Sequence, residues 1–410
     1  MTKNPTRIVL FTTNFYPEDS AIGLYTTQLV NFLIKQEHEI KVVTGFPNYP
    51  FWKIFPNYRN NPRFFTETIN NAEVFRYRQY IPGKVTFAGR ILMMLSLTFG
   101  VFINSFKIKK SDITICIVPY TFLLLPAAIF SWRKSSKLLV HVQDFEFDLA
   151  FESGIAKSNL VFKIIRKPVF LFEKFLLKKA HSISTISNNM MDVGFRKTGK
   201  QIHYFPNWIS ESNINSNDFQ PHDFIDRTKF SLLYSGNIGE KQDWNCLIEL
   251  AKKIMPADNI EIVLVGSGAY IQTLKKQIAP FLFIKIFEPV SYPDLNNLLC
   301  SANLHFLFQK TEVLDTVMPS KLLGMMASEK PSIVTGNINS EVKTIFDKSN
   351  CGVYLATNDA SVLYSEIIRL KQNQELQREM GSSAKQYVLQ HFSEDKVLNK
   401  YYDEVIKTTI

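Results

Sequence analysis

Short apolar runs alternate with longer amphipathic segments along the whole chain. The apolar runs are five to seven residues long and predict buried strands. They are residues 7–13, 39–44, 113–118 and 137–143 in the first half, and residues 230–236, 260–266, 284–289, 304–308 and 331–335 in the second. Helical periodicity separates several of them, as in residues 22–35. Strands alternating with helices form parallel sheets whose faces are both covered, so the pattern predicts an α/β fold.

A polar stretch divides the chain into two predicted domains. Residues 210–224, SESNINSNDFQPHDF, contain few apolar positions and resemble a linker. We predict a doubly wound, Rossmann-like domain over residues 1–209, a linker over residues 210–226 and a second such domain over residues 227–389. The last amphipathic segment, about residues 390–410, is expected to pack back on the first domain. Two such domains would face a shared cleft at the carboxyl ends of their strands.

Cysteine content and charge narrow the class of protein. Four cysteines lie far apart without a CxxC pair, which argues against a zinc site or a disulfide framework and fits a reducing compartment. The first residues contain too short an apolar run for a signal peptide, so we expect a cytoplasmic protein. Residues 1–205 hold 27 Lys and Arg against 13 Asp and Glu, whereas the remainder holds 20 against 24. The first half is therefore expected to face an anionic partner, although a merely soluble basic face is the alternative.

Two apolar segments of the basic half predict contact with a membrane surface. Residues 91–106 form an uncharged run of sixteen residues. That is shorter than the roughly 20 that span a bilayer, so it predicts a buried or interfacial helix. Residues 160–182 interleave Phe, Leu and Ile with cations, which is typical of a helix lying on anionic lipid. Those cations are Lys163, Arg166, Lys167, Lys174, Lys178 and Lys179. Their aliphatic surroundings, and the lack of a nucleic-acid motif, favour an anionic membrane surface over nucleic acid as the partner.

Glycine-containing loops follow two strands of the second half. Residues 233–242, LYSGNIGEKQ, place Gly236 and Asn237 directly after a strand and Lys241 just before a helix. Bare glycine backbone, a helix N-terminus and a lysine together suit a diphosphate. The next strand is followed by VGSGAY, which contributes Gly266 and Gly268. A tight turn would explain either glycine pair equally well.

The stretch DTVMPSKLLGMMA, residues 315–327, is a second candidate anion site. Pro319 suits the first turn of a helix and places Ser320 and Lys321 in that turn. A helix N-terminus is already positive, so a lysine there makes sense if a negative ligand occupies the site. The alternative is an exposed lysine without a ligand.

The first half offers fewer chemical signals. Gly23 lies in a polar loop before a helix, but no GxGxxG motif supports a dinucleotide-dependent oxidoreductase and no GxSxG motif supports a hydrolase. In HVQDFEFDLAFESG, residues 141–154, His141 precedes the alternating acids Asp144, Glu146 and Asp148. Three carboxylates on one face of an extended segment suit a divalent metal or a general base, and a solvated loop is the alternative.

Several of these segments together resemble the family-4 glycosyltransferases of GT-B architecture. The resemblance covers nearly the whole chain and is carried by VQDFEFD (142–148), ISTISNNMM (183–191), YFPNW (204–208), LYSGNIGEKQ (233–242) and VMPSKL (317–322). Within this family the chain is most similar to the colanic-acid-type fucosyltransferase group of bacterial exopolysaccharide assembly.

The resemblance implies transfer of a sugar, such as fucose or a related deoxysugar, with retention of configuration. The donor would be a nucleotide sugar held by the C-terminal domain. The acceptor would be a lipid-linked saccharide, expected to be a polyprenyl diphosphate saccharide, held mainly by the N-terminal domain at the inner face of the cell membrane. GT-B enzymes of this kind need neither a catalytic metal nor another cofactor.

The resemblance also implies roles for individual residues. Lys241, Lys321 and Asp144 would be catalytic, the two lysines by stabilising the leaving diphosphate. The donor-binding residues would be Gly23, Gly236, Asn237, Gly266, Gly268, Glu312, Asp315 and Ser320, and the acceptor-side residues His141 and Glu146.

One departure concerns the donor ribose. The family uses two glutamates with seven residues between them, and the later one contacts the ribose, but Gly324 stands where that residue is often found. GDP and UDP therefore both stay open. Three alternative functions also remain: a metal-dependent transferase using Asp144 and Glu146, a sugar-nucleotide epimerase of the same fold, and a non-catalytic subunit of polysaccharide assembly.

Overall fold

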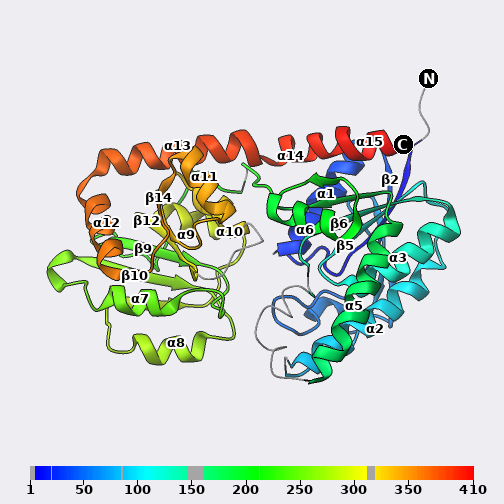
Figure 1. Cartoon of the computed structure of the whole chain (residues 1–410), viewed down its shortest axis with the longest axis horizontal. Coiled ribbons are helices and arrows are strands. Elements are labelled where there is room, and N and C mark those ends of the chain that lie inside the picture. The colour runs from blue at the N-terminus through cyan, green and yellow to red at the C-terminus, as the bar shows by residue number, and fades with distance from the viewer. Residues whose placement is uncertain are drawn as a thin grey trace. The chain divides into compact units, whose positions relative to one another are not determined.

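The computed structural model describes residues 5–19, 21–84, 86–145, 147, 160–211, 213–311 and 319–410. The chain divides into two compact units (Figure 1). The N-terminal unit contains Met1–Pro206 together with Leu398–Ile410, and the C-terminal unit contains Asn207–Val397. Each unit is built around one sheet with helices packed against it.

The N-terminal unit contains an eight-stranded sheet with the order β3-β4-β2-β1-β5-β6-β7-β8. Its strands are β1 (Arg7–Phe11), β2 (Glu39–Gly45), β3 (Phe64–Ile69), β4 (Ala72–Tyr77), β5 (Ile113–Val118), β6 (Lys137–Val142), β7 (Ser182–Thr185) and β8 (Ile202–Tyr204). All neighbouring strands are parallel except β3 and β4, which form an antiparallel hairpin at one edge. Strand β5, ITICIV, is buried along its entire length, as expected for the middle of a sheet covered on both faces.

Helices cover the N-terminal sheet. They are α1 (Ala21–Lys35), α2 (Phe87–Ser105), α3 (Thr121–Lys134), α5 (Leu160–Lys179), α6 (Asn188–Thr198), the C-terminal α14 (Glu394–Tyr401) and α15 (Lys407–Thr409), with a π-helical turn at Tyr402–Ile406 and a 3₁₀ turn at Pro56–Tyr58. Helix α2 begins where the Thr86 hydroxyl accepts a hydrogen bond from the Gly89 amide. Helix α3 packs against both α2 and α5, and the three lie side by side in Figure 1.

The C-terminal unit contains a six-stranded, fully parallel sheet with the order β11-β10-β9-β12-β13-β14. Its strands are β9 (Phe230–Ser235), β10 (Ile260–Val265), β11 (Ile284–Phe287), β12 (Leu304–Phe308), β13 (Ser332–Thr335) and β14 (Gly352–Leu355). Its helices are α7 (Trp244–Ala251), α8 (Ile271–Ile278), α9 (Leu295–Ser301), α10 (Ser320–Ala327), α11 (Glu341–Ser349), α12 (Ala360–Gln372) and α13 (Gln374–Phe392), with a 3₁₀ turn at Pro256–Asp258. This strand order, 3-2-1-4-5-6 along the chain, is that of the doubly wound dinucleotide-binding fold.

The predicted class, two doubly wound α/β sheets, is confirmed. The β3–β4 hairpin and the short strands β7, β8 and β14 were not predicted. Residues 210–224, interpreted above as a linker, pack on the C-terminal unit. The Asn215 amide donates to Asn296 Oδ1 over 2.8 Å, the Gln220 amide donates to Asn297 Oδ1 over 2.8 Å, and Ile214 is buried in the core.

Candidate active site

The C-terminal sheet reverses its strand order between β9 and β12. Ligands of doubly wound sheets bind outside the carboxyl ends of the strands at such a switch point. The loop after β9 carries the glycine-rich segment, and a bridge between Gln242 and Gln309 joins it to the end of β12. Helix α10 begins at Ser320, with Pro319 at its N-cap position and not, as expected, inside its first turn.

Lys321 reaches from the first turn of α10 to this loop. Its ammonium donates a hydrogen bond to Tyr234 Oη over 2.7 Å and lies 4.4 Å from the centre of the Tyr234 ring. Tyr234 in turn donates to the Asn237 carbonyl over 2.6 Å. A Cβ atom added to Gly236 would lie 3.0 Å from Lys321 Nζ, and Gly236 adopts a φ of 148°, which favours glycine. The bare backbone at Gly236 therefore leaves room for a lysine.

Gly266 and Gly268, in the loop after β10, pack closely against the backbone of the loop after β9. A Cβ at Gly266 would lie 1.9 Å from the Gly236 carbonyl oxygen, and one at Gly268 would lie 2.2 Å from the Ile238 carbonyl oxygen. The Ile238 amide also donates to the Ser267 carbonyl over 2.9 Å. The loops after β9 and β10 thus pack backbone against backbone. Gly266 and Gly268 are needed for this packing, and their predicted contact with the donor is a separate role.

Three other predicted donor-side residues are exposed on the segments that carry this cluster or adjoin it. Asn237, Lys241 and Ser320 are exposed on the loop after β9, on the turn before α7 and at the start of α10. Glu312 and Asp315 lie outside the described residues. Chemically, the cluster combines a fixed ammonium, exposed polar side chains and a helix N-terminus, which together suit an anionic group such as a diphosphate.

The N-terminal sheet has its own switch point, between β1 and β5, and a cavity of about 220 Å³ lies there. It is lined by Thr13, Asn14, Ile22, Asn48, Tyr49, Trp52, Gln79, Met93, Leu97, Pro119 and Tyr120. These residues follow β1, β2, β4 and β5 or belong to α1 and α2. Aromatic rings mixed with amide and hydroxyl side chains are the lining that a sugar ring requires.

Glu18 lies beside this cavity and orders the loops that form it. One carboxylate oxygen accepts from the Asn48 and Tyr49 amides and the other from the Phe15 amide and Asn14 Nδ2, over 2.7 to 3.2 Å. Burial raises the pKa of Glu18, whereas these four donors favour its ionised form. Gly23 lies in the first turn of α1, where a Cβ would be 2.4 Å from the Glu18 carbonyl oxygen. Gly23 is therefore required for packing whether or not it also faces a ligand.

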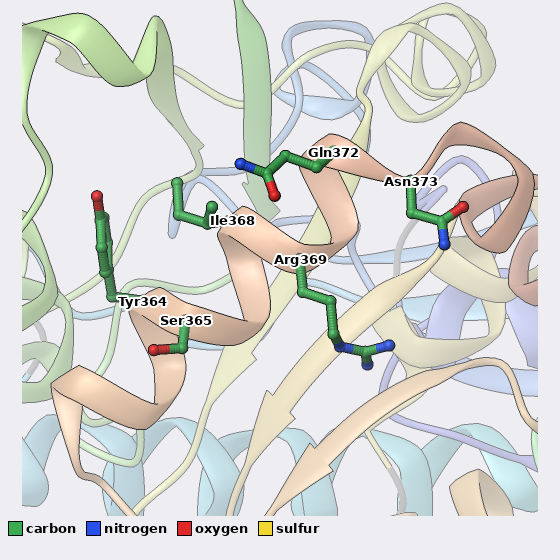
Figure 2. Close-up of a pocket in the computed structure, with 6 residues that line it drawn as sticks. All are labelled: Tyr364, Ser365, Ile368, Arg369, Gln372 and Asn373. Carbon is green, nitrogen blue, oxygen red and sulfur yellow. The ribbon is translucent and has the colours of Figure 1, made fainter.

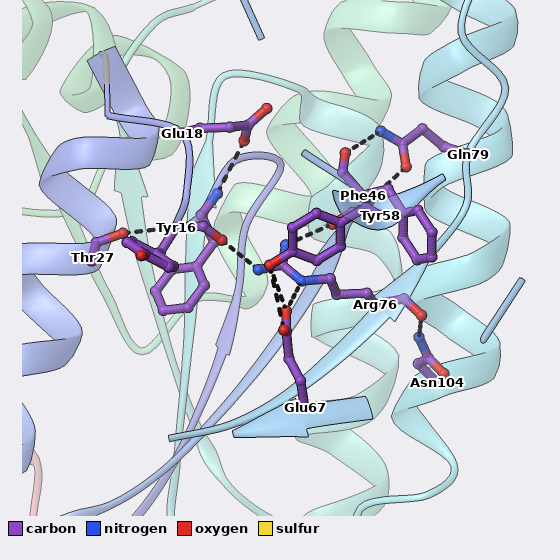
Figure 3. A network of polar contacts seen from close by, with 11 residues as sticks. Tyr16, Glu18, Thr27, Phe46, Tyr58, Glu67, Arg76, Gln79 and Asn104 are labelled. Atoms are coloured by element: carbon purple, nitrogen blue, oxygen red, sulfur yellow. Dashed lines mark hydrogen bonds and ion pairs between the residues drawn. The ribbon is translucent and has the colours of Figure 1, made fainter. Parts of the chain in front are cut away.

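A buried polar network supports the same loops (Figure 3). The Arg76 side chain is fully buried; it forms an ion pair with Glu67 and donates to the carbonyls of Gly45 and Tyr16. The Gln79 amide exchanges two hydrogen bonds with the Phe46 backbone, at 2.8 and 2.9 Å. These contacts tie the segments after β1, β2 and β4 into one rigid wall of the cavity.

The predicted acceptor-side residues after β6 occupy different environments. His141 is buried in the sheet, 3.0 Å from Ser184 Oγ and 2.8 Å from Gln143 Nε2, and burial lowers its pKa to about 3. The structure therefore places His141 in the core, where burial favours the neutral imidazole. Asp144 is half-buried after the end of β6, and Glu146 lies outside the described residues. Within the described part of the chain, no three His, Cys, Asp or Glu side chains cluster as metal ligands.

A second, larger depression of about 510 Å³ runs along α12 (Figure 2). It is lined by Tyr364, Ser365, Ile368, Arg369, Gln372 and Asn373. Arg369 is paired with Glu366 and the Tyr364 hydroxyl donates to Asp258, so these two polar side chains already have partners within the unit. The depression lies on the surface of α12 and not at the end of a strand, so we assign no ligand to it.

Comparison with known proteins agrees with this geometry. Residues 216–387, which contain the whole Lys321 cluster, match the family described as "Glycosyl transferases group 1". The protein is a glycosyltransferase. It is 29% identical over 350 residues to the Escherichia coli (strain K12) glycosyl transferase WcaI, assigned to colanic acid biosynthesis, which covers 82% of this chain and 84% of WcaI. It is 20% identical over 399 residues to the N-acetyl-alpha-D-glucosaminyl L-malate synthase of Bacillus anthracis, over 94% of this chain and 93% of that enzyme.

Solved structures show the fold of this glycosyltransferase. Anabaena HepE in complex with UDP and glucose matches with a TM-score of 0.70 and 13% identity, over 98% of this chain and 100% of HepE. Sucrose-phosphate synthase from Thermosynechococcus elongatus matches with a TM-score of 0.69 and 14% identity, over 98% and 100% of the two chains. The two-unit architecture is therefore GT-B, as the sequence predicted.

The sequence pattern does not single out Tyr234, Glu18 or Arg76 as site residues. Tyr234 lies in a buried apolar run and resembles a core residue, although it is the one large side chain of that run with a polar tip. Glu18 and Arg76 gave no signal, because a charged residue in the sequence does not reveal that tertiary structure will bury it.

Proposed function

We propose that this glycosyltransferase retains anomeric configuration and transfers a sugar from a nucleoside diphosphate sugar to a lipid-linked saccharide. The Lys321 ammonium, seated against Gly236 at the switch point of the C-terminal sheet, carries this proposal. The assignment of WcaI to colanic acid biosynthesis supports a place in bacterial surface polysaccharide assembly. The HepE complexes with UDP support a nucleotide sugar as the donor.

The proposed mechanism is electrostatic. As the bond between the anomeric carbon and the diphosphate breaks, negative charge grows on the leaving phosphate oxygens. Lys321, Lys241 and the N-terminus of α10 stabilise that charge. The acceptor hydroxyl attacks from the face that the diphosphate leaves, and its proton passes to a leaving phosphate oxygen. The products are the glycosylated acceptor and the nucleoside diphosphate, so no further reactant is needed.

The cavity at the β1–β5 switch point is the proposed acceptor site. Its aromatic side chains, Tyr49, Trp52 and Tyr120, offer ring faces, while Asn14, Asn48 and Gln79 offer amides for sugar hydroxyls. Its position in the basic N-terminal unit suits a saccharide that carries a diphosphate. We place this enzyme at the inner face of the cell membrane, with fucose or a related deoxysugar as the transferred group.

Replacement of Lys321 tests the role of the ammonium. Lys321→Ala is expected to lower kcat by about 100-fold, the usual effect of removing one preorganised stabiliser of a leaving oxyanion. Lys241→Ala is expected to lower it on the same scale. Lys252→Ala is the control, because Lys252 is an exposed lysine of the same unit paired only with Glu249. The assay offers membranes and labelled nucleotide sugars to the purified protein and measures label in the lipid fraction.

The same assay separates this function from the alternatives. Label that enters lipid and is unaffected by EDTA supports the proposal, whereas loss of transfer with EDTA would indicate a metal-dependent enzyme. A changed sugar nucleotide formed without lipid acceptor would indicate an epimerase. Donor binding without any turnover would indicate a non-catalytic subunit.

A further inference from the structure

Helix α2 exposes an entirely apolar face. Its outward side chains, spaced three or four residues apart, are Leu92, Leu95, Phe99 and Ile103, exposed by 55%, 46%, 58% and 37%; Phe106 follows at 52%. The opposite face buries Met93, Met94, Leu97 and Val101 in the core. Single exposed apolar residues are ordinary, but an apolar stripe that runs for about four turns indicates a surface that something covers.

The charges around this stripe favour an anionic lipid surface as its occupant. Arg90 lies at one end, 5.4 Å from the Trp52 ring centre, and the exposed cations Lys107, Lys109 and Lys110 lie at the other. No Asp or Glu occurs between Glu73 and Asp112. An apolar stripe flanked only by cations is typical of a helix that lies in a membrane interface.

Aromatic side chains strengthen the same conclusion. Trp132, at the end of α3, is 81% exposed, and the neighbouring Arg133 guanidinium lies 4.0 Å from the Phe106 ring centre. Tryptophan beside cations is the arrangement found at the boundary between lipid and water. A protein partner would more often present a mixed-charge rim.

The depth of insertion follows from the packing of α2. Residues Ala88–Ser105 have a mean hydropathy of 1.4 and are the one candidate for a spanning helix within the described residues, yet 44% of that segment is buried inside the unit. Asn104 Nδ2 also donates to the Arg76 carbonyl over 3.0 Å, which fixes the helix to β4. A helix held on the sheet in this way enters a bilayer by one face and does not cross it.

The proposed acceptor cavity lies on the inner side of the same helix. Met93 and Leu97 line that cavity, while Leu92 and Leu95 are their exposed neighbours on α2. The cavity residue Tyr49 and the nearby Phe51 are exposed by 39% and 70%, and the Tyr80 amide donates to Ser96 Oγ of α2 over 3.0 Å. The cavity therefore lies against the face of α2 opposite the stripe, and Tyr49 is an exposed aromatic residue of its lining.

We propose that the exposed face of α2, together with Phe106 and Trp132, inserts into the interface of an anionic bilayer and brings the acceptor cavity to headgroup level. The saccharide of a lipid-linked acceptor then enters the cavity while its hydrocarbon chain stays in the membrane along α2. The second half of this inference rests on the proposed function, whereas the insertion of α2 does not.

Vesicle flotation tests the insertion directly. The intact chain is mixed with vesicles of phosphatidylcholine alone or of phosphatidylcholine with phosphatidylglycerol, and bound protein is measured. The double variant Leu95→Glu with Phe99→Glu is expected to bind the anionic vesicles at least about tenfold more weakly, because two apolar side chains become charged at the buried interface. Leu282→Glu is the control, since Leu282 is 92% exposed on the other unit. Circular dichroism checks that both variants fold.

A second double variant distinguishes α2 from α5, which exposes Leu171 and Phe175 among Lys167, Lys174 and Lys178. Leu171→Glu with Phe175→Glu is expected to weaken binding less than the α2 variant. Equal binding of the α2 variant and the unchanged protein would overturn the proposal, as would loss of binding in the α5 variant alone. A chain that ignores vesicles but is dimeric, and becomes monomeric in the α2 variant, would show that a second copy covers the stripe.

Trp132 provides an independent probe. Its fluorescence is expected to be quenched by brominated lipid, and Trp132→Phe should remove most of the quenchable signal; quenching that survives this change would contradict the proposed orientation. Lys321→Ala is expected to bind vesicles normally, so membrane binding and catalysis can fail separately. The α2 variant is expected to lose transfer to vesicle-borne acceptor while keeping transfer to an acceptor dissolved in detergent.

Discussion

The contact between Lys321 and Tyr234 shows how single residues prepare the site. The tyrosine hydroxyl accepts from the ammonium and donates to the Asn237 carbonyl, so it connects α10 to the loop after β9. Burial raises the pKa of Tyr234, which keeps the hydroxyl protonated and able to donate. Tyr234 is therefore a positioning residue, and the lysine is the group that would meet the donor.

Tyr234→Phe should show this positioning role. The ring that packs under the ammonium remains, but the two hydrogen bonds are lost. We expect kcat to fall about tenfold and the free energy of unfolding to fall by about 1 kcal/mol, the usual net value of a hydrogen bond. Steady-state kinetics and urea unfolding measure the two effects.

Tyr364→Phe is the control for that experiment, because it also removes a hydroxyl bonded within the C-terminal unit, to Asp258, but on α12. If Tyr234→Phe lost stability while kcat stayed unchanged, the tyrosine would be structural only.

At the level of elements, the sequence predicts what periodicity encodes. Every strand predicted from an apolar run is present, because parallel strands buried on both faces must be apolar throughout. The β3–β4 hairpin was missed because charged and polar residues interrupt it, although its Asn70–Asn71 turn, with φ of 48° and 68°, is a recognisable hairpin signal. Lys321 was found because a lysine at a helix start is unusual, whereas its contact with Gly236 depends on tertiary packing that no local pattern contains.

Two helical glycines predict opposite effects of the same substitution. A Cβ at Gly100 of α2 would lie 1.9 Å from the Tyr77 ring, whereas one at Gly324 of α10 meets only the end of Leu299 at 3.2 Å. Alanine favours a helix by about 1 kcal/mol over glycine, so Gly324→Ala is expected to leave stability unchanged or slightly raised. Gly100→Ala is expected to lower the free energy of unfolding by about 2 kcal/mol or more through overpacking.

Urea unfolding compares these two variants with the unchanged protein. Equal stability of Gly100→Ala would mean that α2 can move away from β4, and would argue against a helix fixed firmly to the sheet.

At the level of the whole molecule, each unit contains one fully buried histidine. Burial lowers the pKa of His141 in β6 and of His305 in β12 to about 3, well below the ordinary 6.5. Between pH 6.5 and 3 the unfolded chain binds more protons than the folded one, so stability is lost as the pH falls through this window. The free energy of unfolding of both units should therefore fall in acid.

Stability at two pH values tests this expectation. Between pH 7 and pH 5 each histidine should cost about 2 kcal/mol of unfolding free energy. His305→Gln removes the titrating group. The unfolding free energy of the C-terminal unit should then differ between pH 7 and pH 5 by about 2 kcal/mol less than in the unchanged protein, even if the variant is less stable at both pH values. His181→Gln, at an exposed position, is the control. An unchanged difference in His305→Gln would refute this account.

The path of the backbone has a consequence for biosynthesis. The N-terminal unit is completed by Leu398–Ile410, where Tyr401 stacks on Phe205 and the Tyr402 hydroxyl bonds His38. A ribosome reaches these residues only after it has made all 191 residues of the other unit, Asn207–Val397. The nascent N-terminal unit therefore stays incomplete, with Phe205 and His38 lacking these contacts, until translation has nearly ended. A chain that stops anywhere within Asn207–Val397 would leave both units incomplete, since the N-terminal unit would also lack its closing segment, Leu398–Ile410.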